Sequence, residues 1–396
     1  MSLALESKGK GDLLDSVIVM AVGVAVIMTN LLAPMLIGVY VDSFRLTLAE
    51  AGYTAAVYMA GAGAGAVLAS WQLLSVRTPL LLAFALSALA IGNLASVNTH
   101  SLEGILAVRL LAGLGEGVGF ALMGAGVARM NNPNRLYAVF VVVALLMGTA
   151  VQYAIPWFRS AFGAPMLFVP IAVAPACLLP FVGKFPSLTE AERPVGIRAS
   201  RSEEGPSRLD FWSGIVATFV VYIAYGGVAA FVERMGVNIG ISADTVAKVL
   251  GMGYFVALVG ALAAILTAHL PARAWKIVIP LCLVAGAMLI TVAGDPIAYR
   301  IGVAALFFGW HFFVPNLMGL MSLADRSGRL AAAVTGAMEC GFAIGPAIAG
   351  LLAHDGSFET VALVGIGGSV LSMVLFVPIL RHVRRVETHT APCVAR

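Results

Sequence analysis

The chain has 396 residues, of which 60% are hydrophobic and 11% are charged, and its formal net charge is +4. A soluble domain carries about 25% charged residues, so one aqueous core cannot bury this much apolar side chain, and the composition indicates an integral membrane protein. The small net charge and the lack of a dense Lys and Arg run predict no nucleic-acid partner.

Apolar runs long enough to cross a bilayer, about 20 residues each, follow one another along the chain. The first six are predicted at 16–40, 50–71, 79–97, 103–130, 136–158 and 164–183. Six more are predicted at 211–234, 243–269, 275–293, 297–322, 330–353 and 359–381. We therefore expect an all-α integral membrane fold of twelve transmembrane helices.

The segment 184–210 is rich in Pro, Ser and charge and is the predicted linker. It separates an N-terminal six-helix bundle, 1–183, from a C-terminal bundle with its tail, 211–396. The nearly equal halves suggest an internal structural repeat, a recurring feature of transporters.

Basic residues set the predicted orientation, because cytoplasmic loops carry an excess of Lys and Arg. With the N-terminus in the cytoplasm, most basic residues fall in cytoplasmic segments. The outer set is small and consists of Arg45, Arg159, Arg234, Lys248 and Arg300. Both termini and the linker are therefore predicted to be cytoplasmic, in a multi-pass inner-membrane protein surrounded by lipid.

The stretch "RLLAGLGEGVGF", 109–120, places two charges inside a predicted span. Each charge costs roughly 2.5–3.5 kcal/mol on insertion scales, and intramembrane charges usually face a bundle interior or a wet cavity. Arg109 could instead snorkel to the interface, but about two turns of helix lie outside it. We therefore predict functional roles for Arg109 and Glu116.

Other polar residues fall at a similar depth on a subset of the spans. Glu339 could carry protons or could hydrogen-bond a neighbouring helix, and a lone His among aromatic residues is more often a packed residue. Asn30 could tie helices together, and the two tyrosines could belong to the core. The predicted substrate-binding set is Arg109, Asn30, Gln152, Tyr222, Tyr225 and His311, and the predicted proton-coupling set is Glu116, Glu339 and Arg109.

Glycines four residues apart allow helix backbones to approach closely. The predicted packing residues are Gly61, Gly65, Gly113, Gly117, Gly341, Gly345 and Pro346. We expect the Gly61/Gly65 face to meet the Gly341/Gly345 face.

The chain resembles the major facilitator superfamily. "RLLAGLGEGVG" is similar to that family's fourth-helix motif, an Arg followed by spaced glycines, which is linked there to proton coupling; the matching positions are Arg109, Gly113 and Gly117. The segment "GFAIGPAIAG", 341–350, resembles its Gly-Pro helices. The resemblance implies that the first, fourth, seventh and tenth helices line a central cavity and that two bundles rock in alternating access.

Two features depart from the family pattern. The loop after the second span keeps only Gly65 and Arg77 of the usual Gly-x-x-x-Asp-Arg-x-Gly-Arg motif, whereas "DRSGR" stands at 325–329. The Gly-Pro signature of many drug exporters is absent from the fifth span, which reads "LLMGTAVQYAIPW".

The leading hypothesis is a monomeric secondary transporter of a small organic solute, coupled to protons or another ion, with an organic anion as the favoured cargo. A proton-antiport exporter of drugs or metabolites and a non-transporting membrane sensor are the alternatives. An enzyme is disfavoured because no HExxH pair occurs. The four cysteines stand far apart, so we expect no metal site, and without a Walker-type motif we expect no cofactor.

Overall fold

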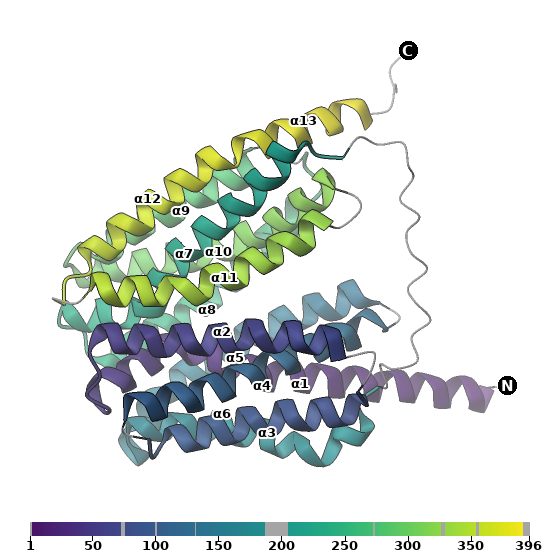
Figure 1. The fold of residues 1–396 in the computed structure, drawn as a ribbon, viewed down its shortest axis with the longest axis horizontal. Helices are drawn as coiled ribbons and strands as arrows, with labels where there is room; N and C mark the ends of the chain where they lie inside the picture. The colour runs from purple at the N-terminus through teal and green to yellow at the C-terminus, as the bar shows by residue number, and fades with distance from the viewer. Residues whose placement is uncertain are drawn as a thin grey trace. The chain divides into compact units, whose positions relative to one another are not determined.

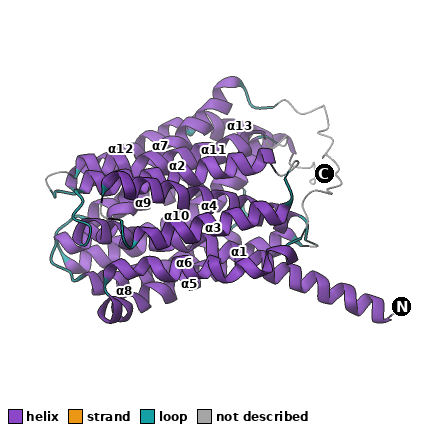
Figure 2. Cartoon of the chain, turned by 60° about the horizontal axis from the view of Figure 1, so that its bottom comes forward, coloured by secondary structure: helices purple, strands orange, loops and turns teal. Residues whose placement is uncertain are grey.

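The computed structural model describes the chain in segments, namely residues 2–72, 76–99, 101–130, 132–186, 205–271, 274–325, 329–353 and 356–390. These residues form helices and loops without a strand (Figure 2). Helices suit this composition because lipid offers no partner to backbone N–H and C=O groups, which must therefore pair within the segment. Within the described residues, eleven helical segments are long and apolar enough to cross a membrane.

The chain divides into two compact units, Met1–Glu192 and Arg193–Arg396. Figure 1 draws the first from purple through blue to blue-green and the second from teal through green to yellow. The division falls within the predicted linker, of which residues 187–204 lie outside the described residues.

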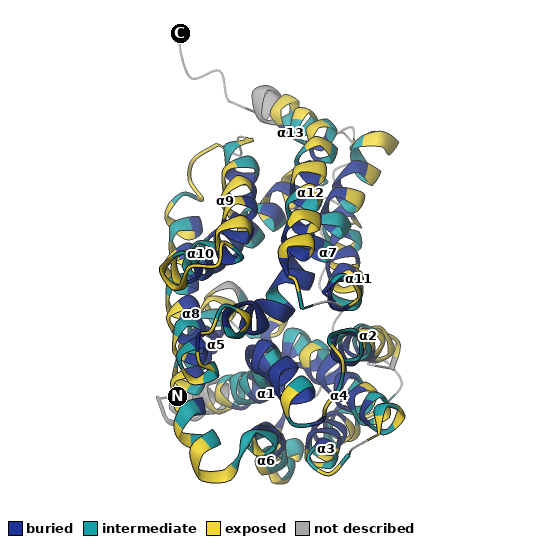
Figure 3. Cartoon of the chain, turned by 90° about the vertical axis from the view of Figure 1, so that its left-hand side faces the viewer, coloured by how far each residue is buried: buried dark blue, intermediate teal, exposed yellow. Residues whose placement is uncertain are grey.

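The first unit is built around α4. Its helices are α1 (Ser2–Asp42), α2 (Leu48–Gln72), α3 (Thr78–Ser96), α4 (Leu102–Ala128), α5 (Pro133–Phe162) and α6 (Phe168–Leu178). In Figure 3, α4 lies among α1, α2 and α3, and its contacts with α2 and α3 are the most extensive in this unit. The α4 helix begins after Ser101, whose side chain accepts a hydrogen bond from the Gly104 amide.

The sixth predicted span is not one continuous α-helix. The 3-10 turns η1 (Ala164–Leu167) and η2 (Leu179–Lys184) flank α6. Each turn has a proline, Pro165 or Pro180, near its start, where the missing N–H is tolerated. The whole segment is nonetheless long and apolar enough to span.

The second unit packs α7 against α11 and α12, and α10 against α8 and α9. The helices are α7 (Arg208–Asn238), α8 (Ala243–Leu266), α9 (Trp275–Thr291), α10 (Pro296–Ala324), α11 (Arg329–Leu352), α12 (Glu359–Leu375) and α13 (Val377–Thr390). The predicted ninth span corresponds to α9, which is apolar but only 17 residues long. The last span continues through α12 into α13, as Glu359–Val386.

The predicted glycine pairing between the second and eleventh helices is wrong. A Cβ at Gly61 would lie 2.7 Å from the Leu110 carbonyl oxygen of α4, and Gly65 lies against the Leu114 backbone of the same helix. A Cβ at Gly345 would lie 2.6 Å from the Ile223 carbonyl oxygen of α7. Each glycine face is therefore used inside its own unit, because small residues bring neighbouring backbones into contact wherever two stripes match.

On α4 the predicted packing glycines meet α2 in return. Gly113 lies against the Tyr58 carbonyl and Gly117 against the Ala62 carbonyl, both too close to accommodate a Cβ. On α11, Gly341 faces the backbone of α7 at Phe219. The close α2–α4 approach determines what surrounds the two charges on α4.

Candidate functional site

Arg109 and Glu116 are both buried on α4, with 1% and 4% of their surfaces exposed. Because they are seven residues apart, they lie about two turns or 10 Å from each other along the helix. Both side chains contact the neighbouring α2, which the glycines of α4 hold close.

A cage of aromatic and amide groups surrounds the Arg109 guanidinium. Its Nη1 donates to the Asn93 Oδ1 of α3 at 2.6 Å. Its Cζ lies 4.3 Å from the ring centroid of Tyr58 and 5.5 Å from that of Phe168, and Tyr40 also hydrogen-bonds it. Desolvated cation–π contacts contribute about 2 kcal/mol, so these rings compensate part of the cost of burying the charge.

Glu116 accepts two side-chain hydrogen bonds. The Tyr58 hydroxyl donates to Oε2 and the Asn30 Nδ2 of α1 donates to Oε1. Tyr58 therefore contacts both charges, with its ring face on Arg109 and its hydroxyl on Glu116. We call these three residues the Arg109–Tyr58–Glu116 bridge.

Two predicted site residues of this unit carry buried polar atoms without a hydrogen-bond partner among the described residues, namely Arg109 Nε and Gln152 Oε1. The amide nitrogen of Gln152, on α5, donates to the Leu31 carbonyl of α1 at 2.9 Å, next to Asn30. A buried polar group without a partner costs about 1–3 kcal/mol. Such groups call for an explanation in terms of function or strain.

In the second unit, the predicted tyrosines belong to an aromatic cluster with Trp310 and Phe342. Tyr225 stacks on Trp310 at a centroid distance of 3.5 Å and an interplanar angle of 2°. Tyr222 meets Trp310 and Phe342 edge to face at 4.7 Å and 5.0 Å. Because both tyrosines are at least 95% buried, they form part of the core of this unit.

Glu339 and His311 occupy different surroundings. Glu339 is exposed on α11 and lies near enough to Tyr222 to interact electrostatically. The Nδ1 of His311 lies 2.9 Å from the Phe307 carbonyl one turn earlier on α10. The His311 ring therefore contacts its own helix, as is expected for a packed histidine. The predicted site residues thus form two groups, one in each unit.

The residues that connect the two charges were not predicted from the sequence. Tyr58 precedes Gly61 by three residues and therefore lies on the same face of α2, a signal that could have identified it. Asn93 is an isolated amide in an apolar run, and this polarity could have identified it. Nothing local marks Tyr40 or Phe168 as neighbours of Arg109.

A buried ion pair on α7 was also not predicted. Glu233 and Arg234 are adjacent, 1% and 7% exposed, and joined by two hydrogen bonds of 2.5 Å and 2.8 Å. The distribution of basic residues predicts Arg234 among the outer set, and the structure buries its side chain within α7. Among the described residues, no group of three or more His, Cys, Asp or Glu residues is arranged to hold a metal ion.

Comparison with known proteins relates the sequence of this chain to a family. Residues 18–338 match the model of the Major Facilitator Superfamily. Among curated proteins, no sequence matches the chain.

Three similar solved structures are transporters. A structure described as giving insight into substrate recognition in proton dependent oligopeptide transporters has a TM-score of 0.74 at 12% identity, covering 95% of this chain and all of the other. The nucleoside transporter NupG gives 0.71 at 12%, covering 94% and 98%. A D-xylose-proton symporter gives 0.65 at 15%, covering 91% and 96%. At these identities the likeness establishes the fold.

Proposed function

This chain belongs to the Major Facilitator Superfamily and is a multi-pass membrane transporter rather than an enzyme, and we propose that it carries a small organic anion coupled to protons. The observation that carries this proposal is the Arg109–Tyr58–Glu116 bridge. It joins a permanent cation to a carboxyl group that can take up a proton, through a single side chain.

Tyr58 supplies a route for coupling. A protonated Glu116 has a hydrogen to donate and fewer acceptor positions, so its bond with the Tyr58 hydroxyl must rearrange. Any movement of Tyr58 also moves the ring that covers Arg109, 4.3 Å away. Proton uptake would therefore uncover the guanidinium and its unpaired Nε for an anionic group.

This arrangement meets the energetic requirement for coupling. A ligand shifts a conformational equilibrium only by the difference between its affinities for the two states. Here cargo binds the state in which Arg109 is uncovered, and the proton favours that same state. Arg is well suited to this role because its fork of donors matches a carboxylate.

The test is Glu116→Gln in proteoliposomes, because Gln is a neutral carboxyl mimic that cannot release a proton. A thermal-shift screen of small organic anions, sugars and nucleosides first identifies a cargo. The variant should exchange this cargo across the membrane yet fail to accumulate it when a pH gradient is imposed. Glu103→Gln, an exposed acid in the first turn of the same helix, is the matched control and should accumulate normally.

Accumulation by Glu116→Gln would show that another group couples transport, and Glu339→Gln is then the next variant. The direction of the imposed gradient that drives accumulation distinguishes symport from proton-antiport export. If the wild-type protein gives no flux under any gradient, the chain is a sensor with a transporter fold.

We place the protein in the inner membrane, with both termini and the 184–210 linker in the cytoplasm, on the basis of the distribution of basic residues. Bundles 1–183 and 211–396 would rock about a central site to give alternating access. A cysteine introduced at position 202 should resist membrane-impermeant thiol reagents in intact cells.

A further inference from the structure

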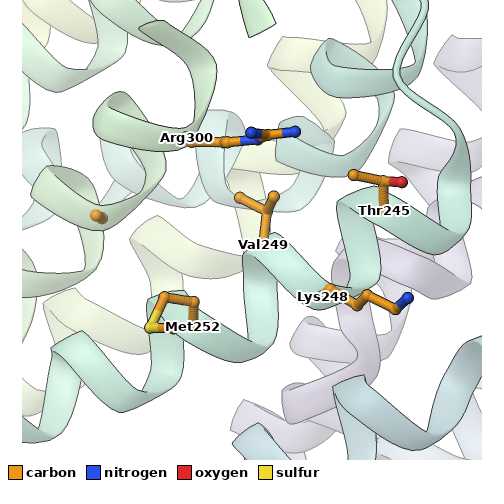
Figure 4. Close-up of a pocket in the computed structure, with 7 residues that line it drawn as sticks. Thr245, Lys248, Val249, Met252 and Arg300 are labelled. Atoms are coloured by element: carbon orange, nitrogen blue, oxygen red, sulfur yellow. The ribbon is translucent and has the colours of Figure 1, made fainter. Parts of the chain in front are cut away.

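A pocket between α8 and α10 belongs to the second unit of the chain, whereas the Arg109–Tyr58–Glu116 bridge belongs to the first. Its volume is about 240 Å³, and its lining includes Thr245, Lys248, Val249, Met252 and Arg300 (Figure 4). It combines two cations and a hydroxyl with apolar side chains, and it includes no carboxylate. Among the described residues, neither Lys248 nor Arg300 forms an ion pair.

The pocket lies on the outer side of the α8–α10 pair. The opposite faces of these helices form the core of the unit, where Tyr254 and Phe307 meet edge to face at 5.0 Å. About two turns nearer the start of α10, the Tyr299 hydroxyl donates to the Val232 carbonyl of α7. Lys248 and Arg300, by contrast, are exposed.

The surroundings of the pocket are apolar and exposed. Met252, in its lining, is 50% exposed, and Ile297 and Ile301, on either side of Arg300, are 64% and 57% exposed. On a membrane protein such a surface suits lipid rather than water. An occupant of this pocket therefore contacts cationic groups at one end and hydrocarbon at the other.

Both cations lie close to the start of their helix and at about the same distance from it. Lys248 is in the second turn of α8 and Arg300 is in the second turn of α10, about 7 Å from each helix start at 1.5 Å per residue. Helix N-termini carry partial positive charge, and long cationic side chains extend toward the membrane interface. Asp244 and Asp295 lie at the same helix starts and offset part of this helix charge, so the cationic end of the pocket is formed by the Lys248 and Arg300 side chains.

We propose that this pocket binds the head-group phosphate of an anionic phospholipid. Lys248 and Arg300 hold the phosphate, the Thr245 hydroxyl donates to it, and an acyl chain lies over Val249 and Met252. A free phosphate ion has the same head chemistry, but it would leave the apolar part of the pocket uncovered. The site thus makes the stability of this unit depend on the lipid composition of the membrane.

The experiment measures thermal unfolding of the full-length protein in detergent, titrated separately with phosphatidylglycerol, phosphatidylcholine and inorganic phosphate. Phosphatidylglycerol should raise the unfolding temperature at a lower concentration than either of the others. Each cation near a membrane surface contributes about 1 kcal/mol to the attraction of anionic lipid, which is about fivefold in affinity. Lys248→Gln and Arg300→Gln should each raise the half-saturating concentration of phosphatidylglycerol by about this factor.

Two controls separate the pocket from general charge effects. Arg208→Gln removes another exposed cation from the same unit and should leave the titration unchanged. The double variant Lys248→Arg/Arg300→Lys keeps both charges and should retain most of the response. Both pocket cations are exposed, so their replacement leaves the core intact, and a helical circular dichroism spectrum checks the fold.

Two outcomes would overturn the proposal. One is an unchanged phosphatidylglycerol response when Lys248 and Arg300 are replaced by Gln together. The other is a response to inorganic phosphate that saturates as readily as the response to phosphatidylglycerol, which would identify a free-anion site.

Discussion

Substitution of Gly117 by Ala tests whether the α2–α4 approach supports the candidate site. A Cβ at this position would lie 2.7 Å from both the Ala62 carbonyl carbon and the Ala66 amide nitrogen, and closer still to the Ala62 carbonyl oxygen. Ordinary contacts begin near 3.4 Å, so the two helices must separate by about 0.7 Å or more. The obstructing atoms are all backbone and cannot rotate away.

The expected cost follows from two opposing effects. Overpacking a well-packed interior costs about 1–3 kcal/mol, and rigid backbone neighbours place this position at the upper end of that range. Replacing Gly by Ala inside a helix gains about 1 kcal/mol from helix propensity. Gly124, also on α4, has no atom within 4 Å of an added Cβ, so Gly124→Ala shows the propensity gain alone.

Thermal unfolding of the two variants in the same detergent and at the same scan rate isolates the steric effect. Gly117→Ala should unfold about 5–10 °C below Gly124→Ala, since 1 kcal/mol corresponds to about 2–4 °C in a domain of this size. The shift should also displace Tyr58, so that Gly117→Ala loses gradient-driven accumulation. If the two variants unfold at the same temperature, the close approach of α2 and α4 does not hold the first unit together.

Three further predictions concern buried charges and their partners. Arg234→Met should cost about 3–5 kcal/mol because it breaks a buried ion pair with Glu233 from one side, and a thermal midpoint close to wild type would contradict this. Lys276→Met should destabilise the α8–α9 connection by about 1.5–3 kcal/mol, because the Nζ donates to the Thr267 and Leu270 carbonyls, just after α8, at 2.8 Å each. Amide exchange at residues 267–270 measures the effect, and unchanged protection there would refute it. Tyr58→Leu should unfold at a lower temperature than Tyr58→Phe, which keeps the ring over Arg109, whereas equal midpoints would mean that this ring contact contributes nothing.

The sequence by itself determined that the chain is a helical membrane protein. Apolar runs of about 20 residues have one stable form in lipid, the helix, because every backbone polar group must be paired within the segment. That constraint is local, so the order of the helices could be read along the chain. The sequence also identified Arg109 and Glu116, since a charge inside an apolar run is conspicuous wherever it points.

The local sequence pattern predicted helix type and helix boundaries less well where a segment departs from a single continuous span. The spacing of Pro165 and Pro180 could have predicted the 3-10 turns around α6, whereas the extension of α13 beyond residue 381 depends on a polar, basic sequence that no hydropathy window favours. Average hydropathy records neither a proline near the start of a turn nor the ability of a polar segment to continue a helix.

Only the tertiary structure decided the partners of each side chain. Gly61 and Gly345 both belong to small-residue patterns that predict close helix packing. The pattern does not indicate which helix is the partner, and in the structure Gly61 packs against α4 and Gly345 against α7. Tyr58 connects Arg109 with Glu116 although it lies about fifty residues before them in the chain. The physical reason is that hydropathy and helix periodicity describe one segment at a time, whereas contacts between helices depend on how whole surfaces fit together.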